Sequence, residues 1–259
     1  MNAIRIFSWW LAGILALASS HGFAKVCDNP VPGLTKFYSD SWGLGFENQR
    51  LQRDTSVTRD NVKQLEVAWS YGYLTSKPRS WPLVSEDTVF IGDSGRGIVA
   101  LDRATGCERW VHAVRGEVAS AILPTRIGEK TALIFLERLQ GVFAIDATDG
   151  KLIWHAVVDD QPIPMYSGTP VIHNGVVYAP LSSLEIGLAI FPIYGCCTTS
   201  GGMAAFDLQT GKKLWFRPTI EEPAKQTGRH WLFVEEYGPS GAPVWGAPML
   251  DPHRGIVYF

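Results

Sequence analysis

The stretch VFAIDATDGKLIW (142–154) has two close copies elsewhere in the chain, IVALDRATGCERW (98–110) and MAAFDLQTGKKLW (203–215). Each copy has Asp at its fifth position, Gly four residues later and Trp four residues after that Gly. The apolar residues before the Asp predict a short buried strand. The Asp side chain can accept backbone N–H bonds in a tight turn, and the Gly can adopt a positive φ without a Cβ clash. Each copy therefore predicts a strand, a turn and a second strand, and three copies predict a repeat protein.

The spacing of the turns indicates the size of the repeating unit. Asp102 and Asp146 are 44 residues apart, which suits a four-stranded β-propeller blade. The next interval, to Asp207, is 61 residues long, and we expect an inserted segment at 182–200. A Trp at a fixed place in each unit is expected to lie flat between neighbouring blades. The sequence predicts an all-β propeller, because the alternative, a β-sandwich, would require three matched Asp/Gly/Trp triplets by coincidence.

The first 24 residues have the features of a secretory signal peptide. Arg5 supplies the charged start, 6–18 is an apolar run, and Gly22-Phe23-Ala24 resembles a cleavage site. The apolar run is too short to span a bilayer well. We therefore expect residues 1–24 to be a signal peptide, the mature chain to begin near Lys25, and the protein to be periplasmic or secreted. No transmembrane segment is expected after signal removal.

The net charge and the cysteine content bear on the partners and the disulfides of the protein. The formal net charge is −2 and no basic run is present, so we expect no nucleic acid partner. Four cysteines in an exported chain predict disulfides, and four allow three pairings. We favour Cys196–Cys197 with Cys27–Cys107. The residues alone leave reduced thiols at Cys196 and Cys197, or thiols paired elsewhere, equally open.

The two ends of the chain both contain parts of a blade. Residues 244–259 (VWGAPMLDPHRGIVYF) predict a strand, a turn and a second strand that open a further blade. Residues 61–73 (NVKQLEVAWSYGY) predict an outer blade strand carrying Trp69. A closed propeller pairs such an N-terminal strand with its final strands. We expect 25–60 to be an N-terminal extension, and 61–259 to hold about three and a half blades of a larger ring whose C-terminal blades are missing. The chain would then be a fragment or a truncated gene product.

The repeat, read as A-x-D-x-x-T-G-x-x-x-W, resembles the tryptophan-docking repeat of quinoprotein dehydrogenases. The resemblance is more specific in SSLE (182–185), YGCCT (194–198) and GPSGAPVW (238–245), which are most similar to polyvinyl-alcohol dehydrogenase and its relatives. It implies about half of an eight-bladed β-propeller that carries pyrroloquinoline quinone (PQQ) and Ca²⁺. It also implies a periplasmic oxidation of secondary or polymeric alcohols, with a c-type cytochrome as the electron acceptor.

The resemblance also implies a cofactor site. Glu185 matches the carboxylate that binds calcium and the quinone, since a hard cation takes anionic oxygen ligands. Trp245 matches the aromatic floor under the cofactor, and the Cys196–Cys197 disulfide would cover the opposite face. The hydroxyl donors to the quinone carboxylates would be Ser167, Thr169, Ser182 and Ser183. Taken without the family, Glu185 is a solvated loop acid, the hydroxyls bond nearby backbone, and Trp245 is one more docking Trp.

The chain departs from the family pattern in ways that bear on activity. Ala119 stands where quinoproteins usually have a cofactor-binding Arg, and Thr199-Ser200-Gly201 follows the cysteine pair where relatives often place another. Arg115 or Arg126 could compensate. The second calcium ligand and the catalytic Asp base belong to later blades, so we expect no catalytic residue in this chain and little activity from it alone. The alternatives are a non-catalytic scaffold propeller with the same repeats, and a propeller that binds polysaccharide or peptide.

Overall fold

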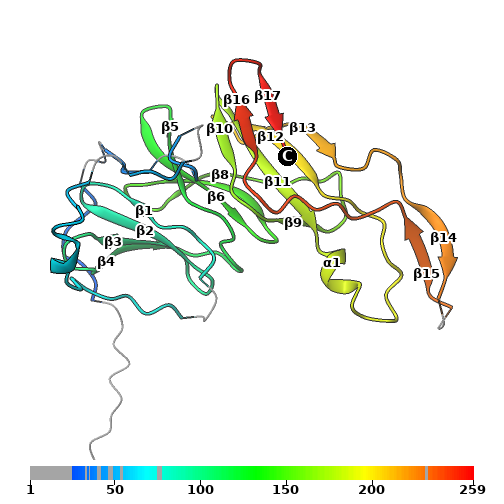
Figure 1. Cartoon of the computed structure of the whole chain (residues 1–259), viewed down its shortest axis with the longest axis horizontal. Coiled ribbons are helices and arrows are strands. Elements are labelled where there is room, and N and C mark those ends of the chain that lie inside the picture. The colour runs from blue at the N-terminus through cyan, green and yellow to red at the C-terminus, as the bar shows by residue number, and fades with distance from the viewer. Residues whose placement is uncertain are drawn as a thin grey trace, which may run out of the picture.

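Three antiparallel sheets of four or five strands follow one another along the chain in a computed structural model, which describes residues 25–32, 34, 36–39, 42–45, 49–52, 55–74, 78–230 and 233–259 (Figure 1). The expected signal peptide, 1–24, lies outside the described residues. Helices in the described part are short, namely η1 (Val62–Gln64) and α1 (Glu185–Leu188), and none is long and apolar enough to cross a membrane.

Each sheet is one propeller blade. The first blade has the order β1 (Leu83–Val84), β2 (Thr88–Asp93), β3 (Gly97–Asp102), β4 (Glu108–His112). The second has the order β5 (Leu123–Ile127), β6 (Lys130–Glu137), β7 (Gly141–Asp146), β8 (Leu152–Ala156). The third has the order β10 (Val171–His173), β11 (Val176–Ser183), β12 (Gly202–Asp207), β13 (Lys213–Pro218), and β9 (Pro164–Tyr166) pairs with β11. The prediction of an all-β partial propeller is confirmed.

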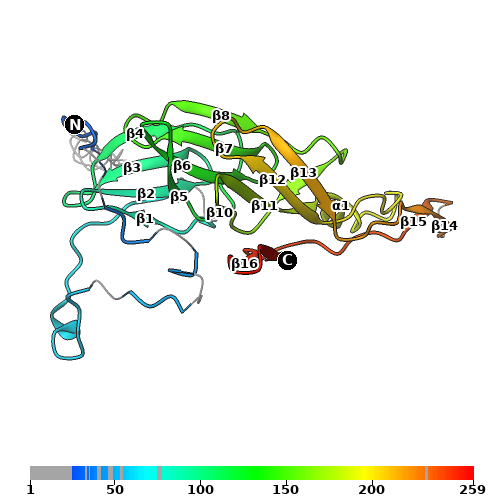
Figure 2. The same ribbon diagram turned by 90° about the horizontal axis from the view of Figure 1, so that it is seen from above.

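The core lies between the blades. Strands β3, β7 and β12 are buried along almost their whole length, because a neighbouring layer covers each face. One apolar cluster joins the first two blades through Phe90, Ile98 and Phe135. A second cluster joins the second and third blades through Ile134 and Phe206. The sheets therefore stack face to face, as Figure 2 shows from above.

The repeated Trp residues hold neighbouring blades together. The glycines of the three turns, Gly106, Gly150 and Gly211, have φ values of 73°, 72° and 71°. A Cβ built on each would lie 2.7 Å from the indole of the preceding repeat unit, that is Trp69, Trp110 and Trp154 in turn. The indole nitrogens of Trp69 and Trp154 donate to the carbonyls of Arg103 and Leu208, both at 2.9 Å. The prediction that the Trp of each copy lies between blades is confirmed for Trp110 and Trp154, and Trp69 docks the segment 61–73 on the first blade in the same way.

The Asp of each turn accepts hydrogen bonds as the sequence predicts. Asp102 Oδ1 accepts from the backbone nitrogens of Ala104 at 3.0 Å and Thr105 at 2.8 Å. Asp146 and Asp207 make the same kind of bond, with backbone nitrogens at 2.9 Å. The shape of each turn is therefore defined by hydrogen bonds within the turn itself.

The segment 61–73 differs from its prediction. It begins with the 3₁₀-helix η1 and continues in extended form without a strand partner among the described residues. Its side chains still dock, because Trp69, Tyr71 and Tyr73 pack on the buried residues of β2 and β3. A β-strand is defined by hydrogen bonds to a neighbour, so the expected strand is absent although its packing face is in place.

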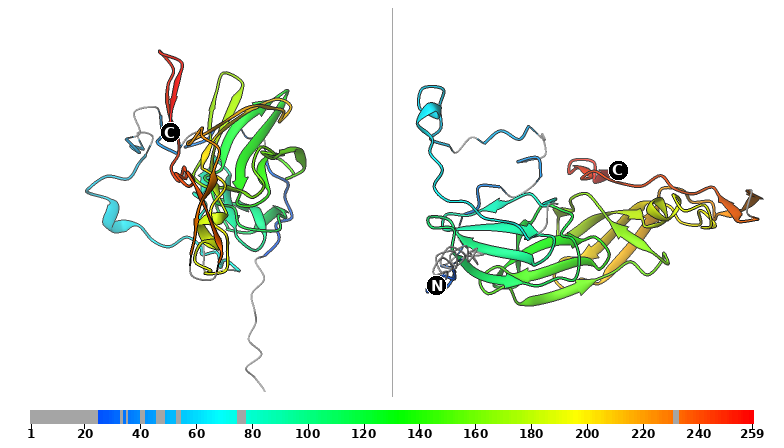
Figure 3. Two further views of the ribbon diagram at one scale, coloured as in Figure 1. Left: turned by 90° about the vertical axis from the view of Figure 1, so that its right-hand side faces the viewer. Right: turned by 90° about the horizontal axis from the view of Figure 1, so that it is seen from below.

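The C-terminal part forms two separate hairpins. Strands β14 (Lys225–Arg229) and β15 (Glu235–Gly238) make a two-stranded arm that projects beyond the third blade, as the right panel of Figure 3 shows. Strands β16 (Met249–Asp251) and β17 (Ile256–Tyr258) pair through the turn that the sequence predicts. The expected hairpin is therefore present, and its place in a further blade stays a prediction.

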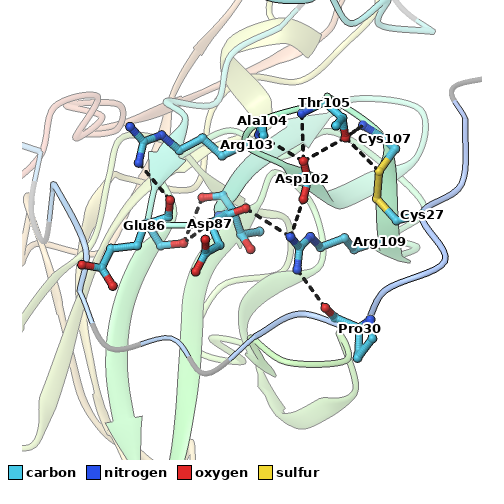
Figure 4. A network of polar contacts seen from close by, with 12 residues as sticks. Cys27, Pro30, Glu86, Asp87, Asp102, Arg103, Ala104, Thr105, Cys107 and Arg109 are labelled. Atoms are coloured by element: carbon cyan, nitrogen blue, oxygen red, sulfur yellow. Dashed lines mark hydrogen bonds and ion pairs between the residues drawn. A yellow bond between two sulfur atoms is a disulfide. The ribbon is translucent and has the colours of Figure 1, made fainter.

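The segment from Lys25 is tied to the first blade at the Asp102 turn (Figure 4). Cys27 and Cys107 form the expected disulfide, and Cys27 N donates to Glu108 O at 2.8 Å. Arg109 pairs with Asp102 and also donates to Pro30 O at 2.8 Å. The disulfide and these polar contacts hold one end of the N-terminal segment on the edge of the blade.

Replacing Cys27 and Cys107 together by serine is expected to lower the free energy of unfolding by about 2–4 kcal/mol. The bond joins residues 80 apart, so its loss restores many conformations to the unfolded chain. Urea denaturation followed by circular dichroism measures the change. An unchanged midpoint in the double variant, with wild-type chain verified as oxidised, would contradict the prediction.

Candidate functional site

The insertion between β11 and β12 begins at the end of a buried strand. The last three residues of β11 pair with β9, so that Ser182 lies opposite Met165 and Ser183 opposite Pro164. Both serines are buried, and α1 starts two residues later with Glu185. The strand therefore delivers Glu185 to one edge of the third blade, at the end opposite to the Asp207 turn.

Glu185 is a buried carboxylate with many hydrogen-bond donors around it; only 3% of its surface is exposed. Its Oε1 accepts from Tyr194 Oη at 3.0 Å and from Thr198 Oγ1 at 3.2 Å. Its Oε2 accepts from the backbone nitrogens of Thr198 at 2.9 Å and Thr199 at 2.7 Å, and from the Thr199 hydroxyl. Two carboxylate oxygens offer about four lone-pair sites, so these donors saturate the group.

The electrostatics of the carboxylate follow from this environment. Burial by itself raises the pKa of Glu185, because it disfavours the charged form. Hydrogen bonds from Thr199, from the backbone of Thr198 and from Tyr194 favour the charged form and outweigh burial, so the net pKa lies below its usual value. The same contact raises the pKa of Tyr194, after burial, because it places the phenol beside an anion. Glu185 is therefore an ionised anchor for residues 194–199.

The adjacent cysteines form the expected disulfide, Cys196–Cys197. Tyr237 of β15 brackets the pair, since Tyr237 N donates to Cys196 O at 2.7 Å and Cys197 N donates to Tyr237 O at 3.4 Å. The loop that begins at Glu185 is thus hydrogen-bonded to β15, and α1 lies between the third blade and the β14–β15 arm (Figure 1). A continuous network joins Glu185, the disulfide and the arm.

The predicted hydroxyl donors have different surroundings. Ser183 Oγ accepts from Glu185 N at 3.1 Å and shares a hydrogen bond with the Thr199 hydroxyl. Ser182 Oγ is buried and has no hydrogen-bond partner in the described residues. Ser167 Oγ donates to Val244 O at 3.0 Å, and Thr169 Oγ1 accepts from Ala121 N at 3.0 Å. The hydroxyl groups of Ser167 and Thr169 therefore make hydrogen bonds to backbone groups.

Trp245 lies close to Ser167 through its backbone. A Cβ on Gly168 would lie 2.8 Å from the carbonyl oxygen of Trp245. The side chain of Trp245 is half exposed. It is not among the residues that line the small cavity beside Glu185, whose walls include Ser183, Ile186 and Cys197. The structure thus gathers Ser183, Glu185 and Cys197 around one cavity, and it brings the backbone of Trp245 close to Gly168.

These residues, as they lie, do not fit a calcium ion or a bound quinone. The cavity has a volume of about 30 Å³, which holds about one water molecule, whereas a tricyclic cofactor needs a pocket of roughly 300 Å³ or more. Both oxygens of Glu185 are already satisfied by protein donors. The described residues contain no group of three or more His, Cys, Asp or Glu that could hold a metal ion.

Three residues of this site were missed by the sequence reasoning as partners of Glu185, namely Tyr194, Thr198 and Thr199. Their only signal is their place around the cysteine pair in YGCCTT (194–199). Of the arginines considered as substitutes, Arg126 lies on β5, where its carbonyl accepts from Gln209 at the Asp207 turn, so it is at the wrong end of the blade. Arg138 is closer to the predicted donors, because its carbonyl accepts from Tyr166 N at 2.8 Å.

Comparison with known proteins identifies a matching family model and similar proteins. A family model described as outer membrane protein assembly factor BamB, PQQ_2, matches residues 50–236. The polyvinylalcohol dehydrogenase of Pseudomonas sp is 31% identical over 239 residues, which are 90% of this chain and 37% of that protein. The polyvinylalcohol dehydrogenase of Sphingopyxis sp. (strain 113P3) is 32% identical over 223 residues, 85% of this chain and 34% of that protein. The chain spans about a third of the length of these relatives.

A solved structure shows the same fold. Quinohemoprotein alcohol dehydrogenase ADHIIG from Pseudomonas putida HK5 superposes with a TM-score of 0.59 at 21% identity. The match covers 84% of this chain and 33% of that one. At this identity the likeness concerns the fold, and it agrees with a partial propeller.

Proposed function

Because the chain belongs to the PQQ_2 family of propeller repeats, and its relatives include polyvinylalcohol dehydrogenases, we propose that it is the N-terminal part of a PQQ-dependent alcohol dehydrogenase. The observation that carries the proposal is the insertion after β11, which gathers a buried carboxylate and an adjacent disulfide at one edge of a blade. The proposed location is the periplasm.

The proposed reaction of the whole enzyme is oxidation of a secondary or polymeric alcohol, with electrons passed to a c-type cytochrome. The quinone supplies the redox chemistry when it is bound. We assign to this chain one wall of that site, made by the eight residues Ser167, Thr169, Ser182, Ser183, Glu185, Cys196, Cys197 and Trp245. In the chain alone this wall is closed on itself by hydrogen bonds, so we propose that the chain alone neither binds calcium at Glu185 nor turns over alcohol.

The test is fragment complementation. The purified chain, beginning at Lys25, is mixed with a polypeptide that comprises the remaining two thirds of the Pseudomonas relative. We expect a one-to-one complex by sedimentation and PQQ-dependent, dye-coupled oxidation of a secondary alcohol by the mixture. The chain by itself, given PQQ and Ca²⁺, is expected to show no turnover and no quenching of Trp fluorescence.

A matched pair of variants makes the test specific. Glu185→Gln is expected to abolish activity of the mixture, whereas Glu222→Gln, an exposed acid of the third blade's flank, leaves it unchanged. Absence of a complex between two folded components would overturn the assignment as part of a dehydrogenase. Turnover by the chain alone would overturn the claim that it is inactive.

A scaffold propeller is the second candidate. The description of the matching family model, an outer membrane assembly factor, favours it. If it is correct, the mixture forms no PQQ-dependent enzyme and Glu185→Gln affects stability only.

A further inference from the structure

The hairpin between β10 and β11 contains the only Asn-Gly pair in the sequence, Asn174-Gly175. Both residues have positive φ values, 47° and 77°, and the residues that flank them, His173 and Val176, pair with each other. Two residues with positive φ between paired strands make a type I′ turn. Both are exposed, and a Cβ built on Gly175 would meet no atom within 4 Å. The pair therefore lies in open space at the tip of a tight hairpin.

An Asn that is followed by Gly is chemically labile in water. The backbone nitrogen of Gly175 can attack Cγ of Asn174, because glycine has no Cβ to obstruct the approach. The nitrogen loses its proton, the bond from Cγ to the side-chain nitrogen breaks, ammonia leaves and a five-membered succinimide remains. Water then opens the ring at either carbonyl, so the net reaction consumes one water, releases one ammonia and yields aspartate or isoaspartate. Within the described part of the chain, the Asn174 amide makes no hydrogen bond that would hold it back.

The intact hairpin slows the closure of the ring. A type I′ turn fixes the rotation about the Asn174 Cα–C bond, and the succinimide requires a different rotation. The hairpin can open, because β10 is only three residues long and lies at the edge of its sheet, where it pairs with β11 alone. Short edge elements open locally at a small part of the free energy of global unfolding. Opening of β10 is therefore the step that gives Asn174 the freedom to react.

The turn also supports the contact between two blades. Gly175 O accepts from Leu208 N at 2.8 Å, and Leu208 O in turn accepts from the indole nitrogen of Trp154 at 2.9 Å. Trp154 packs in the apolar cluster that joins the second and third blades. Isoaspartate adds one methylene group to the backbone, so the turn no longer fits between His173 and Val176. The hydrogen bond from Leu208 to the turn would then be lost.

We propose that Asn174 is a site of spontaneous deamidation in the folded protein, and that isoaspartate at this position loosens the docking of Trp154. The reaction requires water and no enzyme. The site is independent of the proposed function, because the same blades dock in a dehydrogenase and in a scaffold propeller. Chemical ageing at the β10–β11 turn thus reaches the contact between the second and third blades.

The first measurement follows the reaction itself. The purified chain is kept at physiological temperature in mildly alkaline buffer, with and without guanidinium chloride. Peptide mass spectrometry and enzymatic methylation of isoaspartate then quantify the product. We expect Asn174 to react in the folded chain, about tenfold or more slowly than in guanidinium chloride. Asn61, which precedes Val62, is the internal control and is expected to stay intact. No reaction of Asn174 in the folded chain, or equal reaction of Asn61, would refute the assignment.

A matched variant tests the effect on the fold. Asn174→Gly removes the reactive amide and keeps the turn, because glycine adopts a positive φ without strain. After the same incubation, the wild type is expected to unfold at a lower urea concentration than before, whereas Asn174→Gly is expected to unfold as it did when fresh. Hydrogen exchange at Leu208 N is expected to become faster in the incubated wild type only.

A second variant separates the added charge from the longer backbone. Fresh Asn174→Asp has the charge of the product but an ordinary backbone, so it is expected to unfold like fresh wild type. If it already shows the full loss of stability, isoaspartate is not the cause and the link to Trp154 is wrong. The link is also wrong if the incubated wild type contains isoaspartate at position 174 while its stability and the exchange at Leu208 stay unchanged.

Discussion

Replacing Trp154 by alanine is expected to lower the free energy of unfolding by about 3–5 kcal/mol, because the indole is buried between two blades. Trp154 is 8% exposed and packs in the cluster that joins the second and third blades. It lies over Gly211, and its nitrogen donates to Leu208 O at 2.9 Å. The substitution removes apolar contacts, leaves a cavity and deprives the Leu208 carbonyl of its donor. Each of these changes lowers the free energy of unfolding.

The neighbouring repeat provides the matched control. Trp215 has the same position in the third copy, but it is 38% exposed, and its ring lies 6.0 Å from that of Tyr178 in its own sheet. We expect Trp215→Ala to cost less than about 1 kcal/mol. Urea unfolding followed by circular dichroism compares the two, since fluorescence itself changes with the loss of a Trp. Equal costs at the two positions would show that docking between blades is not what stabilises the repeat.

Glu185→Gln is expected to destabilise the chain by about 3 kcal/mol near neutral pH, because it keeps the size of a buried side chain but removes its charge. One carboxylate oxygen becomes an amide group that donates. That group would face the backbone nitrogen and hydroxyl of Thr199 or those of Thr198, which also donate. Residues 194–199 would lose their anchor, and limited proteolysis should cut them faster. Glu222→Gln is the control, since Glu222 is exposed.

The effect of Glu185→Gln should depend on pH in a defined direction. The pKa of Glu185 is lower in the folded protein than its ordinary value of 4.5. A group of this kind contributes stability that is fully present above its unfolded pKa and is lost as the pH falls through its folded pKa. The difference between wild type and Glu185→Gln is therefore expected to be constant above about pH 5.5 and to shrink below about pH 4. A difference that grows in acid would contradict the assignment of an ionised Glu185.

The candidate site was predictable from the sequence only in part. The insertion at 182–200, the cysteine pair and Glu185 stand out in the sequence, and the structure brings Ser183, Glu185 and Cys197 together. Their role in cofactor binding remains a prediction. The hydrogen bonds that Tyr194, Thr198 and Thr199 donate to Glu185 could not be predicted from the sequence, because no pattern in it indicates that residues 194–199 fold back onto Glu185. The same holds for Ser167 and Thr169, whose partners are Val244 and Ala121, 77 and 48 residues away.

The sequence by itself determined the repeat, the blades and the form of each Asp–Gly turn. It could do so because those features depend on hydrogen bonds and torsions within about five residues, as in the bonds from Asp102 to Ala104 and Thr105. Only the tertiary structure decided that 61–73 docks its aromatic rings without pairing as a strand, and that Glu185 is closed in by the loop behind it. Those outcomes depend on which distant segments come to lie beside each other, and a local pattern contains no information about its partner.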